Sequence, residues 1–145
     1  MSKTLLYGAT KVDETNAAYA AIECLSQFQW KNRVLVIFSD SDNSRAASQE
    51  NQLLADRAAL EERDMIVLKV SGNALRAVFG AAEPVDAGAL RDVLDAPDTG
   101  TFHAALIGKD GTVKLKVSEP VSNGELFAII DSMPMRAAES MKPEH

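Results

Sequence analysis

The sequence predicts an α/β domain in which a strand–helix–strand unit is followed by a helix, a β-hairpin and a closing helix. Two observations carry this prediction. The apolar runs 33–38 and 65–70 flank about twenty residues of helical pattern, which is typical of a parallel βαβ crossover. An Asp110-Gly111 pair between two further strand-like runs predicts an antiparallel hairpin.

Composition excludes several classes of protein. The 145 residues are 46% hydrophobic and 25% charged, as in one globular domain rather than a disordered chain. Fifteen basic and 21 acidic residues give a net charge of −6, so we expect no nucleic-acid partner. No run approaches the roughly 20 apolar residues of a membrane-spanning helix. A single cysteine excludes an internal disulfide and zinc sites that need two thiolates.

Residues 1–27 are expected to form a lead-in segment. An alanine-rich stretch from Asn16 predicts a helix that ends near Ser26, and Phe28 and Trp30 are expected to pack this segment against the domain. The apolar patch at the start of the chain is too short for a secretory signal. We therefore expect a cytoplasmic protein if the chain is complete, and a periplasmic or secreted one if a signal peptide has been removed.

The βαβ unit comes next. Run 33–38 is continuously apolar and rich in β-branched residues, which indicates a strand covered on both faces. Segment 39–44 contains residues that cap helices and form turns. One long helix with a single apolar stripe is expected over 45–63. Run 65–70 is the second buried strand, and a turn at 71–73 ends the unit.

The second half of the chain supplies a helix and the hairpin. Residues 75–79 predict a short helical turn, and 87–94 predict a helix with Asp86 as its N-cap. Runs 102–108 and 113–117 are the two hairpin strands, joined by a two-residue turn in which Asp-Gly supplies the positive φ angles.

The last elements complete a thioredoxin-like order. Lys114 and Lys116 are expected on the solvent-facing side of an edge strand. A closing helix covers 125–131, and the tail 137–145 is expected to fray. The order β-α-β then α-β-β-α predicts a thioredoxin-like domain over 28–136, with a mixed central sheet and helices on both faces.

Particular strings resemble a known family. They resemble a peroxiredoxin-like domain of unknown function found in small bacterial proteins and in animal extracellular proteins, including sushi-repeat-containing ones. The resemblance implies a thioredoxin-like fold without the peroxidatic cysteine and with no established catalytic activity. The strings are FQWKNRVLVIF at 28–38, LEERD at 60–64, LIGKDG at 106–111, LF at 126–127 and IDSMPMR at 130–136.

The position of a reactive thiol is filled by other residues. Thioredoxins and peroxiredoxins carry that cysteine after the first strand of the βαβ unit, at a helix N-terminus that lowers its pKa. Here this segment is 39–44 and contains no sulfur, and no proline directly precedes Phe102, where such proteins usually have a cis-proline. We expect Cys24 to be a half-buried apolar side chain whose pKa is raised by Glu23. The alternative is an atypical thiol peroxidase that uses Cys24.

The same segment suggests a second enzymatic alternative. A strand followed by Asp40 and Asp42 resembles the Asp-x-Asp of phosphatases, in which one carboxylate attacks phosphorus, the other protonates the leaving group, and magnesium lies between them. Later strand ends offer no matching lysine and carboxylate outside a hairpin. We expect instead that Asp40, Asp42, Asn43 or Ser44 caps the next helix by accepting from backbone N–H groups two or three residues onward.

The sequence therefore predicts a redox-inactive thioredoxin-like domain that acts as a binding or structural module. The expected partner is another protein, and no catalytic residue, cofactor or metal ion is assigned. Arg76 either lines a binding cleft or is held in a structural ion pair, and His103 is expected as a hydrogen-bonded histidine within the sheet. The candidate binding surface consists of Ser39, Asp40, Asp42, Asn43 and Arg76.

Overall fold

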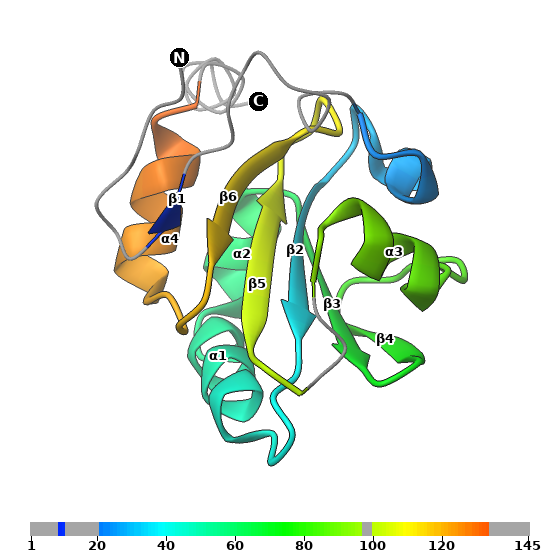
Figure 1. Cartoon of the computed structure of the whole chain (residues 1–145). Coiled ribbons are helices and arrows are strands. Elements are labelled where there is room, and N and C mark those ends of the chain that lie inside the picture. The colour runs from blue at the N-terminus through cyan, green and yellow to red at the C-terminus, as the bar shows by residue number, and fades with distance from the viewer. Residues whose placement is uncertain (1–8, 11–20, 97–99, 134–145) are drawn as a thin grey trace, which may run out of the picture.

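A six-stranded mixed sheet forms the centre of the molecule (Figure 1). The computed structural model describes residues 9–10, 21–96 and 100–133. The strands lie in the order β1-β6-β5-β2-β3-β4. The elements are β1 (Ala9–Thr10), the 3-10 helix η2 (Glu23–Phe28), β2 (Arg33–Phe38), α1 (Ser44–Leu54), α2 (Arg57–Glu62), β3 (Met65–Ser71), β4 (Ala74–Phe79), α3 (Ala87–Val93), β5 (His103–Ile107), β6 (Val113–Val117) and α4 (Asn123–Asp131).

Strand β2 is the central strand. It pairs in parallel with β3 and antiparallel with β5, in a register that joins Val34 to Ile107 and Phe38 to His103. Strands β5 and β6 are antiparallel neighbours in a hairpin. The parallel pair and the hairpin predicted from the sequence are therefore both confirmed.

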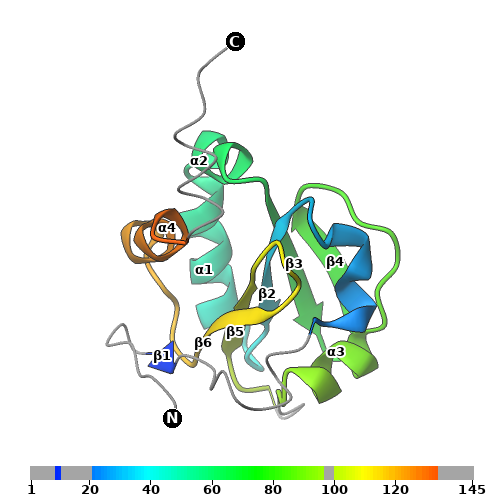
Figure 2. The same ribbon diagram turned by 90° about the horizontal axis from the view of Figure 1, so that it is seen from above.

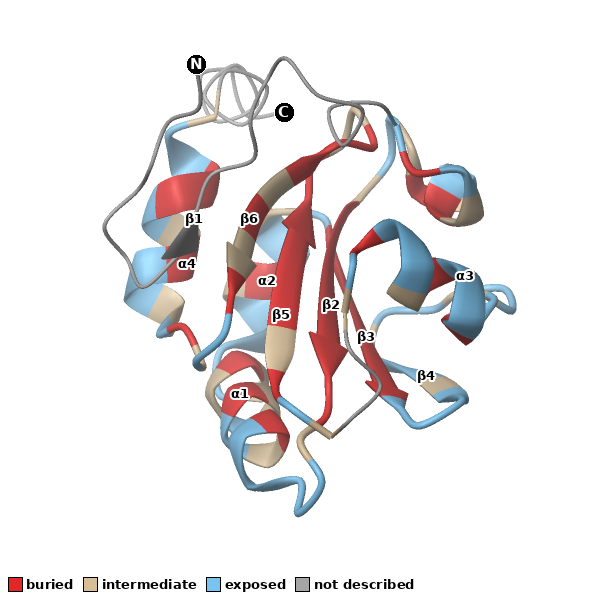
Figure 3. Ribbon diagram, viewed as in Figure 1, coloured by how far each residue is buried: buried red, intermediate tan, exposed pale blue. Residues whose placement is uncertain are grey.

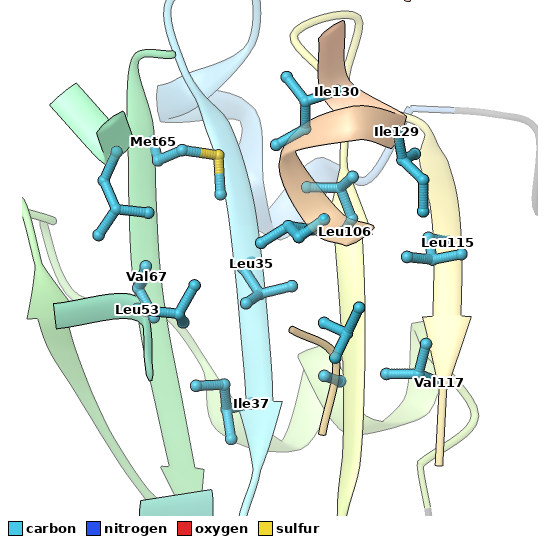
Figure 4. Packing of buried hydrophobic residues seen from close by; sticks show 14 of the residues in the cluster. Leu35, Ile37, Leu53, Met65, Val67, Leu106, Leu115, Val117, Ile129 and Ile130 are labelled. Atoms are coloured by element: carbon cyan, nitrogen blue, oxygen red, sulfur yellow. The ribbon is translucent and has the colours of Figure 1, made fainter. Parts of the chain in front are cut away.

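Helices cover both faces of this sheet, as predicted. Figure 2 shows α1, α2 and α4 on one side and α3 with η2 on the other. On the first side, Leu35 and Leu106 of the sheet pack with Leu53 of α1 and Ile130 of α4 (Figure 4). Figure 3 shows that β2 and most of β3 and β5 are buried, whereas the outer strand β4 is partly exposed. The continuous apolar runs at 33–38 and 65–70 are thus explained by burial on both faces.

Two helical predictions are wrong. The single helix expected over 45–63 is divided into α1 and α2, because the side chain of Asp56 accepts a hydrogen bond from the N–H of Ala59 at 3.2 Å and starts a new helix. The helical turn expected over 75–79 is strand β4, which pairs with β3. Gly72, with φ +60°, is the first residue of the two-residue turn between them, a position where hairpins favour glycine.

The hairpin turn also differs from the prediction. The N–H of Gly108 donates to the carbonyl of Thr112 at 2.9 Å, so the connection has three residues, 109–111, rather than two. Only Gly111 of these has a positive φ, +85°, which is the arrangement of a turn followed by a glycine bulge. Strand β6 is moreover covered in part by β1, which pairs opposite Lys116.

The ends of the domain hold further differences. Residues 11–20, which include much of the predicted lead-in helix, and the tail 137–145 lie outside the described residues. The described part of that segment is the 3-10 helix η2. Phe28 is buried as expected, but Trp30 is 64% exposed and does not pack against the domain. Asp86 caps α3 as predicted, through the N–H groups of residues 88 and 89.

Candidate functional site

The loop 39–43 joins β2 to α1 at the carboxyl end of the parallel pair β2–β3 (Figure 1). Open α/β sheets bind ligands at this edge. Four of the predicted surface residues, Ser39, Asp40, Asp42 and Asn43, lie in this loop. The fold thus places them where the thiol of a thioredoxin-fold enzyme would lie.

The carboxylate of Asp40 accepts hydrogen bonds from the first turn of α1 through both of its oxygens. The N–H of Arg45 donates to Oδ2 at 2.9 Å, and the N–H of Ala46 donates to Oδ1 at 3.0 Å. Desolvation raises the pKa of Asp40, but these backbone hydrogen bonds outweigh it and hold the pKa well below its usual range. Oδ1 of Asp42 accepts from the N–H of Ser44 at 3.1 Å. The predicted self-capping is confirmed, although Asp40 reaches five and six residues onward.

A buried lysine packs against the loop from β3. The side chain of Lys69 is only 6% exposed, and its Nζ lies 2.5 Å from Oε2 of Glu50 on α1. The same Nζ lies 2.5 Å from Oδ1 of Asn43, which also accepts from the hydroxyl of Ser39 at 3.0 Å. Asn43 has a φ of +62°, a left-handed conformation that asparagine tolerates better than most residues. Lys69 therefore fixes the loop at its most strained residue.

Arg76 belongs to the same network. Its Nη2 lies 3.0 Å from Oε1 of Glu50, so one carboxylate joins Arg76 and Lys69. Of the two alternatives for Arg76, the structure shows the ion pair. Sequence reasoning missed Lys69 and Glu50. The available signal was a lysine inside the otherwise apolar run 65–70, since a buried ammonium needs a partner.

The backbone at Gly100 passes directly over the loop. The N–H of Ser41 donates to the carbonyl of Gly100 at 2.7 Å. Gly100 has φ +78°, and a Cβ at this position would lie 2.8 Å from Cβ of Ser41. The space beside Ser41 is therefore filled by main chain.

Cys24 lies far from this loop. It belongs to η2, before the start of β2, whereas the loop follows the end of β2, about 20 Å away along a six-residue strand. The half-buried thiol packs against the second cluster of buried apolar residues, which lies on the η2 and α3 side of the sheet and includes Leu25, Phe38 and Leu90, and burial raises its pKa. The carboxylate that adds to this rise is Asp86, not the adjacent Glu23 that the sequence suggested. A raised pKa leaves little thiolate at neutral pH.

His103 begins β5 opposite Phe38, beside the loop. It is half-buried, and burial together with the charge of Lys116 lowers its pKa. Its ring makes no hydrogen bond with the described residues, so the expected hydrogen-bonded histidine is not found.

The described residues contain no group of three or more His, Cys, Asp or Glu side chains that could hold a metal ion. The carboxylate of Asp40 is oriented toward α1 by its hydrogen bonds to two helix N–H groups. No helix within the described ranges is long and apolar enough to cross a membrane.

The sheet order and the covering helices define a thioredoxin-like α/β protein. The fold is similar to the crystal structure of a reduced 2-Cys peroxiredoxin from Plasmodium vivax, with a TM-score of 0.56 and 20% identity, over 81% of this chain and 72% of that one. At this identity the likeness concerns the fold.

Sequence comparison identifies the family. Residues 24–139 match the family described as "Domain of unknown function (DUF4174)", and the chain belongs to it. A relative, Coiled-coil domain-containing protein 80 of Danio rerio, is 31% identical over 134 residues. The match covers 79% of this chain and 15% of that relative. A domain of unknown function with a thioredoxin-like fold is therefore confirmed, while its occurrence in small bacterial proteins and in sushi-repeat-containing animal proteins stays a prediction.

Proposed function

We propose that this domain is a redox-inactive binding module for another protein. The observation that supports it is the Asp40 cap. In a thioredoxin-fold thiol enzyme, the N–H groups that begin the helix after the first strand stabilise a thiolate. Here the carboxylate of Asp40 accepts hydrogen bonds from two of those N–H groups, so the chain's own anion takes the thiolate's place.

Two further observations favour a module over an enzyme. The polar side chains of the loop are hydrogen-bonded to one another and to α1, and the hydroxyl of Ser44 occupies the point between the carboxylates of Asp40 and Asp42, at 3.2 Å and 3.0 Å. The match to 15% of a longer animal protein is what a domain used as one part of a larger protein produces.

Peroxide consumption with a dithiol reductant tests the redox half of the proposal. We expect the same background rate from the wild-type chain and from Cys24→Ser. A rate that depends on Cys24 would overturn the proposal in favour of a thiol peroxidase. In parallel, magnesium-dependent hydrolysis of p-nitrophenyl phosphate that is lost in Asp40→Asn would indicate a phosphohydrolase instead.

A further inference from the structure

The turn that joins η2 to β2 carries the most exposed large hydrophobic side chain among the described residues. We call residues 29–32 the Trp30 turn. Trp30 is 64% exposed and belongs to neither of the two clusters of buried apolar residues that lie on the two faces of the sheet. Its φ of +68° lies in the left-handed region, which is unfavourable for a bulky residue and natural for glycine. The chain thus has a tryptophan where the backbone alone would favour glycine.

Hydrogen bonds that do not involve the indole hold this turn in place. The N–H of Trp30 donates to the carbonyl of Lys109 in the β5–β6 hairpin at 2.5 Å. The N–H of Lys31 donates to the carbonyl of Phe28 at 2.9 Å. The side-chain amide of Gln29 donates to the hairpin backbone at 3.0 Å. The indole is therefore presented on a pre-organised turn, which lowers the entropic cost of a contact.

The size of the exposed group indicates how it would be used. A tryptophan buries at most about 250 Å², which is far less than the roughly 800 Å² that each partner buries in a stable interface. The Trp30 turn therefore provides too little buried area to hold two flat surfaces of this chain together. A projecting indole contributes most when it enters a pocket on the partner, where tryptophan is among the commonest residues to dominate binding.

The charge around the turn favours an acidic partner. Lys31 is exposed and makes no ion pair within the described part of the chain. The neighbouring lysines of the hairpin are neutralised, Lys109 by Asp64 at 2.7 Å and Lys114 by Asp110 at 2.8 Å. The indole thus lies beside one uncompensated positive charge.

We propose that the Trp30 turn is the contact surface for a protein partner, which supplies an acidic segment whose apolar side chains enclose the indole. The inference rests on the proposed function, because it concerns the partner of a binding module. It places the contact at the start of β2, at the opposite end of that strand from the loop 39–43, which we call the Asp40 loop.

A selection with random peptides displayed on phage tests this inference, with the full-length wild-type chain as target. Trp30 is the one tryptophan of the sequence, so a shift of its fluorescence reports a contact at this turn. We expect the selected peptides to combine acidic with apolar residues and to shift this emission. By calorimetry they should bind Trp30→Gly at least about 30-fold more weakly and Lys31→Gln about 2–5-fold more weakly.

Controls separate a lost contact from a damaged fold. Trp30→Gly should melt no lower than wild type, because glycine relieves the strained φ. Val93→Ala, at another exposed hydrophobic residue, should bind the peptides as wild type does.

Three outcomes would overturn the inference. They are peptides that bind Trp30→Gly as tightly as wild type, selected peptides without acidic residues, and a failure to select any peptide. A blue shift of Trp30 emission on phosphatidylserine–phosphatidylcholine vesicles, without peptide binding, would assign the turn to a lipid surface. A Cys24-dependent peroxidase rate would instead refute the proposed function, so the two failures can be told apart.

Discussion

Replacement of Lys69 by methionine tests whether the buried ion pair holds the Asp40 loop. Methionine keeps the apolar stem of lysine but removes the ammonium that contacts Glu50 and Asn43. The side chain of Glu50 is only 12% exposed, so water can solvate its carboxylate only in part. After the substitution, Arg76 is the remaining ionic partner of Glu50 among the described residues.

The expected loss of folding stability follows from the burial of both partners, Lys69 and Glu50. Removing one member of a buried ion pair costs about 3–5 kcal/mol, because the other charge stays buried. Arg76 remains on Glu50, so we take the lower end, about 3 kcal/mol. For a domain of this size that loss lowers Tm by about 10 °C. Arg76→Met is the matched control, because Arg76 is 60% exposed and exposed ion pairs contribute about 0–1 kcal/mol.

Urea unfolding followed by circular dichroism measures these differences. The double variant Lys69→Met/Glu50→Met should recover much of the loss, since no unpaired charge is then buried. If Lys69→Met costs no more than Arg76→Met, or if the double variant is less stable than Lys69→Met alone, the reasoning from buried charge is wrong.

Three other substitutions test the remaining features of the site. Asp40→Ala should destabilise the chain by about 0.5–2 kcal/mol at pH 7. Because the pKa of Asp40 is lowered on folding, its stabilising effect is fully present above the unfolded pKa of about 3.9 and is lost progressively as the pH falls from there toward the lower pKa of the folded state, so the difference between variant and wild type should be smaller in unfolding curves at pH 2 than at pH 7. Cys24→Ser should leave Tm nearly unchanged, and the rate of Cys24 alkylation against pH should give a pKa above the free value of about 8.5; a lower value would contradict this. Gly100→Ala should lower stability by about 1–2 kcal/mol because of its positive φ and its closeness to Ser41, so a variant as stable as wild type in thermal melts would argue against the close approach.

Elements with local signals were predictable. A strand covered on both faces has a continuous apolar run, which located β2 and β3. Asp86 and the Asp40 loop carry side chains that cap helices whatever the rest of the fold does. The Asp110-Gly111 pair located the hairpin, although only the glycine takes a positive φ.

Features that depend on distant partners were not predictable in this way. Residues 74–79 form a strand because β3 pairs with them, and their own pattern is too short to distinguish a strand from a helical turn. Glu50 and Lys69 come together only when α1 packs on the sheet, so their pairing has no local signal. Trp30 was expected inside because it is large and apolar, but such residues can also lie on the surface.

The position of β2 has a consequence for how the chain is made. Val34 pairs with Ile107, about seventy positions later, so β2 has a neighbour on only one side until β5 has left the ribosome. During synthesis the nascent chain therefore exposes the apolar edge of its central strand, which is a surface prone to aggregation. A fragment that ends before residue 100 would lack both the partner strand β5 and the Gly100 carbonyl that accepts from the N–H of Ser41. The hairpin that completes the sheet is thus also the element that covers this edge.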